Sequence, residues 1–242
     1  MREVIMILQC YFGSCLMSFL LCVSRCRLHH WKQLFSRSKC NHCFKTLRWW
    51  MLIPIMSFIL LKGRCFYCHY PIPRFLWVGE CLGAFISFFI LTHAFQIETI
   101  YLYLLSFILL TISFIDVQSY IVPHRLLLLL LVMVAIMRPG HFHFSLLTCL
   151  CMSILLVLGI VFHHFIGFGD IKLLMVLFMI LPVPFVLYTI WFTFPLAYLC
   201  YPFYAPFLSD KHYIPLVPFI TLSFFIVAYC YPLLNVWLGG VI

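Results

Sequence analysis

The stretch that decides the fold reads Phe165-Ile-Gly-Phe-Gly-Asp-Ile-Lys172, and it places Asp170 between two long apolar runs. A second aspartate, Asp116, closes the apolar run 99–115 in the same way. The chain has only three aspartates, so two of them share this unusual position. A charged side chain at membrane depth costs about 3 kcal/mol and is a default candidate for function. The sequence therefore predicts an aspartate pair that acts on water.

The composition is that of a polytopic, all-α membrane protein. Of its 242 residues, 66% are hydrophobic and 9% charged, which is more apolar surface than a soluble domain can bury. Apolar runs near twenty residues indicate membrane-spanning helices. We predict about eight transmembrane helices, at residues 4–24, 75–95, 99–115, 120–137, 145–165, 171–187, 188–208 and 214–237.

The basic residues are distributed unequally between the two membrane faces. Ten Lys and Arg residues lie between residues 25 and 74, and Arg125, Lys172 and Lys211 fall in short loops on the same side, leaving Arg2 and Arg138 opposite. The positive-inside tendency makes the basic side cytoplasmic. Both aspartates then reach the cytoplasmic face. This topology accounts for the net charge of +9, so nothing requires nucleic acid as a partner.

We divide the chain into three parts. Residues 1–24 form the first transmembrane helix, residues 25–74 a cytoplasmic loop, and residues 75–242 the transmembrane core that carries both aspartates. Within the loop, the apolar run 49–61 is interrupted by Pro54 and is too short for an ordinary span. We expect it to lie on, or dip into, the cytoplasmic leaflet. No internal repeat is visible.

Four of the thirteen cysteines form two Cys-x-x-Cys pairs in the only long polar segment. Cys40-Asn-His-Cys43 and Cys65-Phe-Tyr-Cys68 are separated by 21 residues, a form typical of a four-cysteine zinc site. Such a site would be structural, because all four metal positions are filled by protein. The alternatives are reduced, unliganded thiols or a redox pair. The other nine cysteines lie in or beside apolar runs, where thiols act as small core residues.

Paired carboxylates suit general acid–base work. Two carboxylates a few ångströms apart cannot both ionise easily, so one takes a proton from water while the other donates to the scissile carbonyl. This is the division of labour of an aspartic protease. The alternative is that each aspartate is an interfacial cap or a salt-bridge partner of Arg125 or Lys172.

Five further residues are candidates for supporting roles around the pair. Gly167 and Gly169 let the backbone bend and a neighbouring segment approach. Pro123 fixes a turn after Asp116, so Asp116 is expected to end its helix in a short hinge. Lys172 either anchors the cytoplasmic face or acts on a nearby carboxylate. Glu80 is a helix-start acid, a structural hydrogen-bond acceptor or a member of the site, in that order of preference.

Taken together, these motifs resemble the type IV prepilin peptidases, a family of integral-membrane aspartic proteases. The resemblance covers nearly the whole chain and rests on Gly13-Ser14, Phe19, Arg37-Ser38-x-Cys40-x-x-Cys43, Ile53-Pro54-x-x-Ser57, Gly63-Arg64-Cys65-x-x-Cys68, Glu80, Asp116 with Ile121-x-Pro123, Gly167-x-Gly169-Asp170-x-Lys172 and Ile214-Pro215-x-x-Pro218-Phe219. Each motif is weak alone, but their order and spacing are specific.

The resemblance implies that Asp116 and Asp170 are the catalytic pair and that the four cysteines hold a cytoplasmic zinc loop. It implies a multi-pass protein of the bacterial cytoplasmic membrane, with its active site facing the cytoplasm. The substrates would be type IV prepilins or pseudopilins of pilus, competence or secretion machinery. Some members also methylate the new N-terminus with S-adenosylmethionine.

Two other classes compete with a peptidase. An ion-coupled transporter would place acids near the bilayer midplane within repeated halves, whereas the two best acids here lie at one face. A structural docking protein would need the cysteine loop but neither aspartate. Exchanging each aspartate for asparagine separates all three classes.

Overall fold

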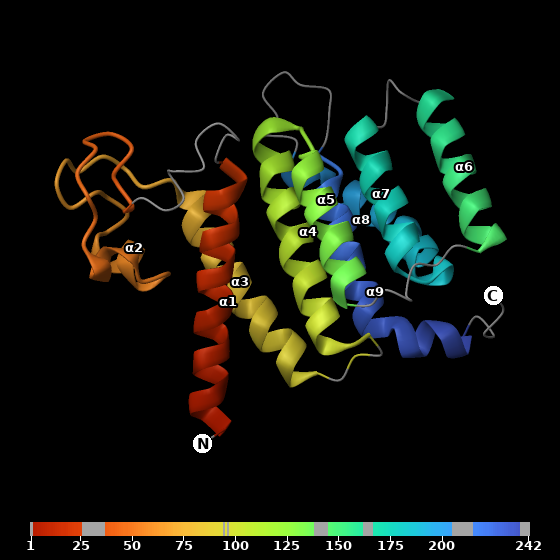
Figure 1. The fold of residues 1–242 in the computed structure, drawn as a ribbon, viewed down its shortest axis with the longest axis horizontal. Coiled ribbons are helices and arrows are strands. Elements are labelled where there is room, and N and C mark those ends of the chain that lie inside the picture. Colours follow the sequence, from red (N-terminus) through yellow and green to blue (C-terminus); the bar gives the residue numbers. More distant parts are fainter. Residues whose placement is uncertain are drawn as a thin grey trace. The chain divides into compact units, whose positions relative to one another are not determined.

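The computed structural model describes residues 2–25, 37–93, 95, 97–137, 145–161, 167–204 and 215–237. By their internal contacts the residues form two compact units, Met1–Ala94 and Phe95–Ile242, drawn together in Figure 1. Helices dominate both units, as the sequence predicts. Four of the basic residues used for the topology, Arg27, Lys32, Arg138 and Lys211, lie outside the described residues.

Two long helices build the first unit. They are α1 (Arg2–Arg25) and α3 (Arg74–Thr92), which pack against each other along their length. They cross closely at Gly13 and Gly83, where a Cβ added to Gly83 would lie 2.8 Å from the carbonyl oxygen of Gly13. Glycine is needed at this crossing because only a residue without a side chain lets two helix backbones approach so closely.

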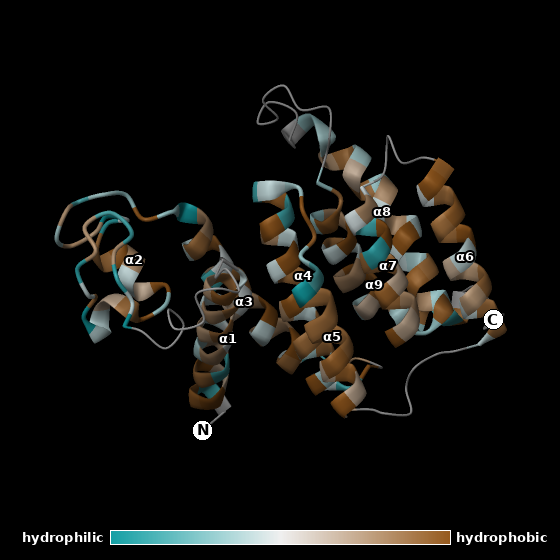
Figure 2. Cartoon of the chain, turned by 45° about the horizontal axis from the view of Figure 1, so that its top comes forward, coloured by the Kyte–Doolittle hydropathy of each residue, from teal (hydrophilic) through white to brown (hydrophobic). Residues whose placement is uncertain are grey.

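The segment between α1 and α3 contains two short helices and two cysteine turns. The 3-10 helix η2 (Trp49–Leu52) and the helix α2 (Met56–Leu60) cover part of the apolar run 49–61. The cysteine turns lie on either side of them in the sequence. Figure 2 shows that hydrophobic residues cover the helices, while hydrophilic residues gather in the loops around α2.

Six helices form the described part of the second unit. They are α4 (Thr99–Ser119), α5 (His124–Met137), α6 (Leu146–Val161), α7 (Phe168–Ile180), α8 (Val183–Tyr204) and α9 (Val217–Trp237). α4 packs against α5 and α9, and α7 packs against α5, α6 and α8. α4 is apolar and buried along most of its length, from Leu102 to Ser113, as expected of a helix inside a bundle.

Eight helices of the described chain coincide with the eight predicted spans, but not all can cross a membrane alone. Five are long and apolar enough: Glu3–Ser24, Arg74–Thr92, Thr99–Ser119, Val183–Pro202 and Val217–Val236. α5 and α6 are shorter, and α7 has only 13 residues, about 20 Å of helix. The chain therefore has the helices of a multi-pass membrane protein, and the count of eight complete spans is not confirmed.

One predicted boundary is wrong. The sequence places the change from the sixth to the seventh span at residues 187 and 188, whereas α7 ends at Ile180 and α8 begins at Val183. Leu181 is extended, with φ −123° and ψ 155°. Pro182 causes this, because a proline disfavours helical geometry in the residue before it.

Candidate functional site

Asp116 lies in the last turn of α4 and is 4% exposed. The helix continues past it to Ser119 and ends at Tyr120, which adopts a left-handed conformation and donates its N–H to the carbonyl of Asp116. The prediction that Asp116 ends its helix is therefore wrong by three residues. The carboxylate accepts the backbone N–H of Val217 at 3.2 Å. Since Val217 begins α9, Asp116 satisfies one of the unpaired N–H groups of that helix.

Asp170 lies in the first turn of α7, not before the helix as the predicted boundary implied, and is 9% exposed. Gly167 is the N-cap residue, and its backbone N–H donates to the Asp170 carboxylate. This is the reciprocal arrangement of a capping box, in which a side chain at the third helical position bonds back to the cap. A Cβ at position 167 would lie 3.0 Å from Asp170 Oδ2, so Gly167 leaves room for the carboxylate.

The two carboxyl groups are close enough for the charge of Asp116 to act on Asp170. They come from α4 and α7, which α5 joins by packing against both. The start of α7 lies against Val122 at Gly169, where an added Cβ would lie 2.9 Å from Cγ2 of Val122. Val122 and Pro123 form the turn between α4 and α5. Gly169 therefore allows the first turn of α7 to lie directly on the segment that follows Asp116.

The contact that the structure shows for Lys172 is with Phe168, not with an aspartate. Its ammonium lies 5.4 Å from the ring centroid of Phe168, one turn earlier in α7. Phe168 is exposed, so the pair lies on the outer face of the helix. This contact favours the anchoring role that the sequence suggested over a role on a carboxylate.

Glu80 belongs to the first unit, on the second turn of α3. Its Oε1 accepts the hydroxyl of Ser18 on α1 at 2.8 Å, and its Oε2 accepts the backbone N–H of Ile55 at 2.8 Å. Of the three roles considered for Glu80, this geometry corresponds to the structural acceptor.

The four predicted metal-ligating cysteines, Cys40, Cys43, Cys65 and Cys68, lie together in the first unit. The two cysteine turns have the same backbone design. The N–H of Cys40 bonds to the carbonyl of Lys45, and that of Cys65 to the carbonyl of Tyr70. Phe44 and His69, one residue after each second cysteine, both have positive φ. The sequence predicts no repeat, yet these two turns, 25 residues apart, share one backbone design.

The cysteine sulfurs fit a tetrahedral metal. All four Sγ atoms lie within 4.8 Å of one another, and those of Cys40 and Cys68 are 3.8 Å apart. Zn–S bonds of about 2.3 Å in a tetrahedron place sulfurs about 3.8 Å apart. Hydrogen bonding from the backbone of Cys43 lowers the pKa of the Cys40 thiol to about 6, which favours its thiolate, whereas burial and hydrogen bonds with the other three thiols raise the pKa of Cys68 to about 12.

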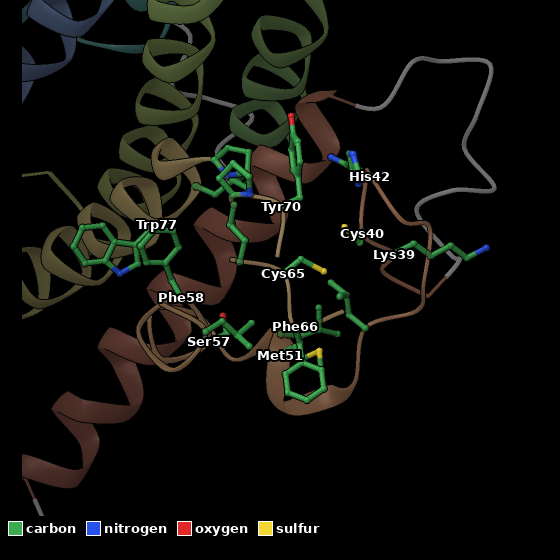
Figure 3. A pocket seen from close by; sticks show the side chains of 18 of the residues that line it. Lys39, Cys40, His42, Met51, Ser57, Phe58, Cys65, Phe66, Tyr70 and Trp77 are labelled. Carbon is green, nitrogen blue, oxygen red and sulfur yellow. The ribbon is translucent and has the colours of Figure 1, made fainter. Parts of the chain in front are cut away.

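A ring stack joins the two cysteine turns outside the sulfur cluster. His42 and Tyr70 lie with their ring centroids 4.4 Å apart at an angle of 10° (Figure 3). His42 comes from the first turn and Tyr70 from the second. The stack therefore adds a contact that does not depend on the metal.

The sequence reasoning missed Val122 and Val217, which position the aspartates through a side chain and a backbone N–H. No side-chain chemistry marks either residue. The nearby prolines, Pro123 and Pro218, were the available signals, because proline is common in turns and in first helical turns.

Two family profiles match the chain. The bacterial peptidase A24 N-terminal domain matches residues 11–94, and the type IV leader peptidase family matches residues 103–203, which include both aspartates. A prepilin leader peptidase/N-methyltransferase of Bacillus subtilis is 32% identical over 184 residues, which cover 71% of this chain and 72% of that protein. The chain belongs to the type IV leader peptidase family. The family resemblance inferred from the motifs is thereby confirmed.

Other relatives with the same name match over shorter stretches. The protein of Legionella pneumophila is 32% identical over 44% of this chain and 40% of its own length. That of Stutzerimonas stutzeri is 30% identical over 58% of this chain and 52% of its own length. The chain thus spans about half or less of these relatives. No solved structure matches it.

Proposed function

We propose that the chain is a membrane aspartic endopeptidase that removes the leader peptides of type IV prepilins or pseudopilins. The observation that carries the proposal is the meeting of Asp116 and Asp170, buried at 4% and 9% exposure, within a unit of a type IV leader peptidase family member. The relatives' names supply the substrate class. Pilus, competence or secretion machinery would use the product.

In this proposal the two aspartates share the work of an acid and a base. One carboxylate removes a proton from the attacking water, and the other donates a proton to the oxygen of the scissile carbonyl. The backbone N–H groups of Val217 and Gly167 each occupy part of one carboxylate's acceptor capacity, which orients the carboxylate while leaving further lone pairs for water and substrate. The bonds that cap α9 and α7 are thus compatible with catalysis.

The test replaces each aspartate by asparagine, which keeps the shape and removes the exchangeable proton. Asp116→Asn and Asp170→Asn should each abolish cleavage of a co-expressed type IV prepilin, read as a mobility shift and an N-terminal sequence. The third aspartate provides a matched control, and Asp210→Asn should cleave normally. Normal cleavage by either of the first two variants would contradict the aspartic-peptidase proposal. Both residues would then be helix caps or part of the ion pathway of a transporter.

We also propose that the cysteine turns and both aspartates face the cytoplasm of a bacterial cell, with the termini outside. The support is the excess of basic residues in the first loop, of which Lys39, Lys45 and Lys62 are exposed. An impermeant amine-reactive reagent should label these three lysines only after cell lysis, as read by peptide mass spectrometry. Labelling in intact cells would reverse the topology.

The cysteine cluster is proposed to hold one structural Zn2+. Its role would be to fix the two turns, because the segment is too small to fold by burial alone. Metal analysis of protein purified without chelators tests this. A zinc content near zero would refute it.

A second activity, N-methylation of the mature N-terminus, is favoured by the names of the relatives and by one cavity of the first unit. The cavity has a volume of about 260 Å³, and rings of Phe58, Tyr70 and Trp77 line it together with the Glu80 carboxylate (Figure 3). Aromatic rings can stack on an adenine or face a sulfonium, and a carboxylate can accept ribose hydroxyls. These residues therefore fit S-adenosylmethionine, which would supply the methyl group.

Equilibrium dialysis with labelled S-adenosylmethionine tests the cavity without relying on methyl transfer. Tyr70→Ala should weaken binding several-fold while leader cleavage is retained. Unchanged binding in this variant would exclude the cavity as the site, and absence of binding to the unmodified protein would argue against the activity. Neither result would bear on the peptidase.

A further inference from the structure

The segment of residues 49–61, which we call the interfacial segment, exposes an unusual number of large apolar side chains. Trp49 and Leu52 are exposed on η2, and Met56, Ile59 and Leu60 are exposed on α2. Trp49 is 78% and Leu60 62% exposed. On α2 the three residues have the i, i+3, i+4 spacing that places them on one face of the helix. A loop surrounded by water would not be expected to carry such a face.

Hydrogen bonds fix where this segment lies along the long helices of its unit. Glu80 of α3 accepts the N–H of Ile55 and the hydroxyl of Ser18, so the turn before α2 lies beside both α3 and α1. Glu80 is six residues from Arg74, the start of α3, which is about 9 Å along the helix axis. Ser18 is seven residues from Arg25, the end of α1, which is about 10 Å.

The length of α3 allows the depth of Glu80 and Ile55 in the bilayer to be estimated. With 19 residues, α3 is about 28 Å long, close to the hydrocarbon thickness of about 30 Å. A spanning helix of this length has no turns to spare outside the membrane, so Arg74 must lie near the headgroups. Glu80 and the turn at Ile55 then lie about 9 Å deeper. Amphipathic helices that bind membranes lie at this depth, 5–10 Å into the boundary between headgroups and acyl chains.

The hydrogen bonding of Ile55 is compatible with the same depth. Ile55 has φ 64° and ψ −55°, and the N–H of Met56 bonds to the carbonyl of Pro54 at 2.6 Å, which is a strained γ-turn. An N–H in water needs no carboxylate partner, but an N–H in lipid must be satisfied by the protein. Glu80, itself costly at this depth unless it is bonded, provides that partner.

The ends of the interfacial segment carry the charges expected at a lipid surface. Arg48 precedes it, Lys62 follows it, and both are exposed. Basic side chains at the ends of an apolar segment can reach lipid phosphates while their neighbours remain in the acyl region. The segment therefore matches the bilayer in apolar surface, depth and charge.

We propose that residues 49–61 are inserted into the headgroup–acyl boundary of the leaflet beside Arg74, and that Glu80 sets their depth by holding Ile55. The partner is the phospholipid bilayer itself. The insertion extends the lipid-facing surface of α1 and α3 sideways and fixes the cysteine turns at the membrane surface. It holds whether or not the aspartates are catalytic.

Photo-crosslinking of the full chain tests the proposal. A benzophenone-bearing phenylalanine replaces Leu60, and the protein is reconstituted in vesicles of phosphatidylethanolamine and phosphatidylglycerol. Phe85 of α3, 62% exposed, is the positive control, and Phe44 in the first cysteine turn, 74% exposed, is the matched negative control. Mass spectrometry should find lipid adducts at positions 60 and 85 and at least several-fold fewer at position 44.

Equal adduct yields at positions 60 and 44 would overturn the insertion, and crosslinks from position 60 to a second copy of the chain would replace it by a protein interface. The role of Glu80 is tested in the same assay. Glu80→Leu removes both acceptors and should lower the yield at position 60 several-fold without changing the yield at position 85. An unchanged yield at position 60 would show that Glu80 does not set the depth.

Discussion

The cysteine cluster and the aspartate pair bring like side chains together in opposite ways. Each half of the cluster is a short turn with its own hydrogen bonds, and the turn of Cys40 has the same backbone design as that of Cys65. The aspartates come from the end of α4 and the start of α7, and the bonds that orient them reach Val217 and Gly167. The cluster is thus specified locally, whereas the pair depends on the packing of several helices.

This difference predicts how each site responds to change. A locally built site should lose its metal when one ligand is removed but should leave the rest of the molecule folded. A site built by packing should be sensitive to small changes at helix contacts that carry no reactive group. Four sets of substitutions examine this contrast, from the largest expected effect to the smallest.

The largest effect is expected from the aspartates themselves. Each single Asn variant should lower leader cleavage by about 10³-fold or more, because neither carboxylate can cycle a proton without the other. The double variant, Asp116→Asn with Asp170→Asn, should be little worse than either single one. Quantitative cleavage assays measure this, with zinc content as the control that the cysteine cluster is unchanged. Multiplicative losses would mean that the two residues act independently.

The second-largest effect is expected at the cysteine cluster, when one of its cysteines is removed. Cys43→Ser should reduce bound zinc from about one per chain to near zero, because structural sites need all four ligands. Residues 37–73 should then become sensitive to protease, while cleavage of the prepilin falls less than in the aspartate variants. Cys81→Ser, in α3, is the matched control and should keep its zinc. Full zinc retention by Cys43→Ser would contradict the four-cysteine site.

Gly169→Ala should impair the aspartate pair without touching either carboxylate. The added methyl would lie 2.9 Å from Cγ2 of Val122, so the first turn of α7 must shift. Displacements of a catalytic group by less than 1 Å lower rates by about 10-fold to 100-fold. We expect a loss of this size in the turnover rate of the prepilin.

The same contact offers a rescue. Val122→Ala removes Cγ2, the atom nearest to an alanine at position 169, but keeps the Cβ at 3.0 Å, so the double variant should recover part of the lost rate. A double variant as slow as Gly169→Ala alone would show that the glycine is needed for another reason.

The smallest effect concerns the stack between the cysteine turns. Tyr70→Ala removes a stacked ring contact worth about 0.5–1.5 kcal/mol. The chelator concentration that removes half of the zinc should fall about 2-fold to 10-fold. Tyr70→Phe keeps the ring and should behave as the unmodified protein does. Equal zinc loss in both variants would assign the effect to the hydroxyl.

Local features were readily predicted from the sequence. The cysteine pairs are recognisable because their spacing alone determines the turn, and the apolar runs predict the helices because lipid requires them. The positions of Asp116 and Asp170 were notable because charges are rare in such runs. The catalytic roles of the two aspartates remain predictions.

The contacts that hold the aspartates in place were not predicted. The N–H of Val217 is 101 residues from the carboxylate it binds, and no pattern in the sequence records that bond. The boundary between α7 and α8 was misplaced because apolar residues continue across it, and only the prolines at 182 and 184 mark the break. The two Cys-x-x-Cys pairs are visible in the sequence, but the backbone design that their turns share is not, because it consists of backbone hydrogen bonds.

The bond from Val217 to Asp116 also bears on the order in which the protein is made. A ribosome delivers α4 to the membrane long before it has synthesised α9, so Asp116 of the growing chain lacks this partner until α9 is inserted. Its carboxylate is not held in the orientation seen here during that interval. Biosynthesis itself therefore delays completion of the aspartate pair until α9, about 100 residues further along the chain, has been made.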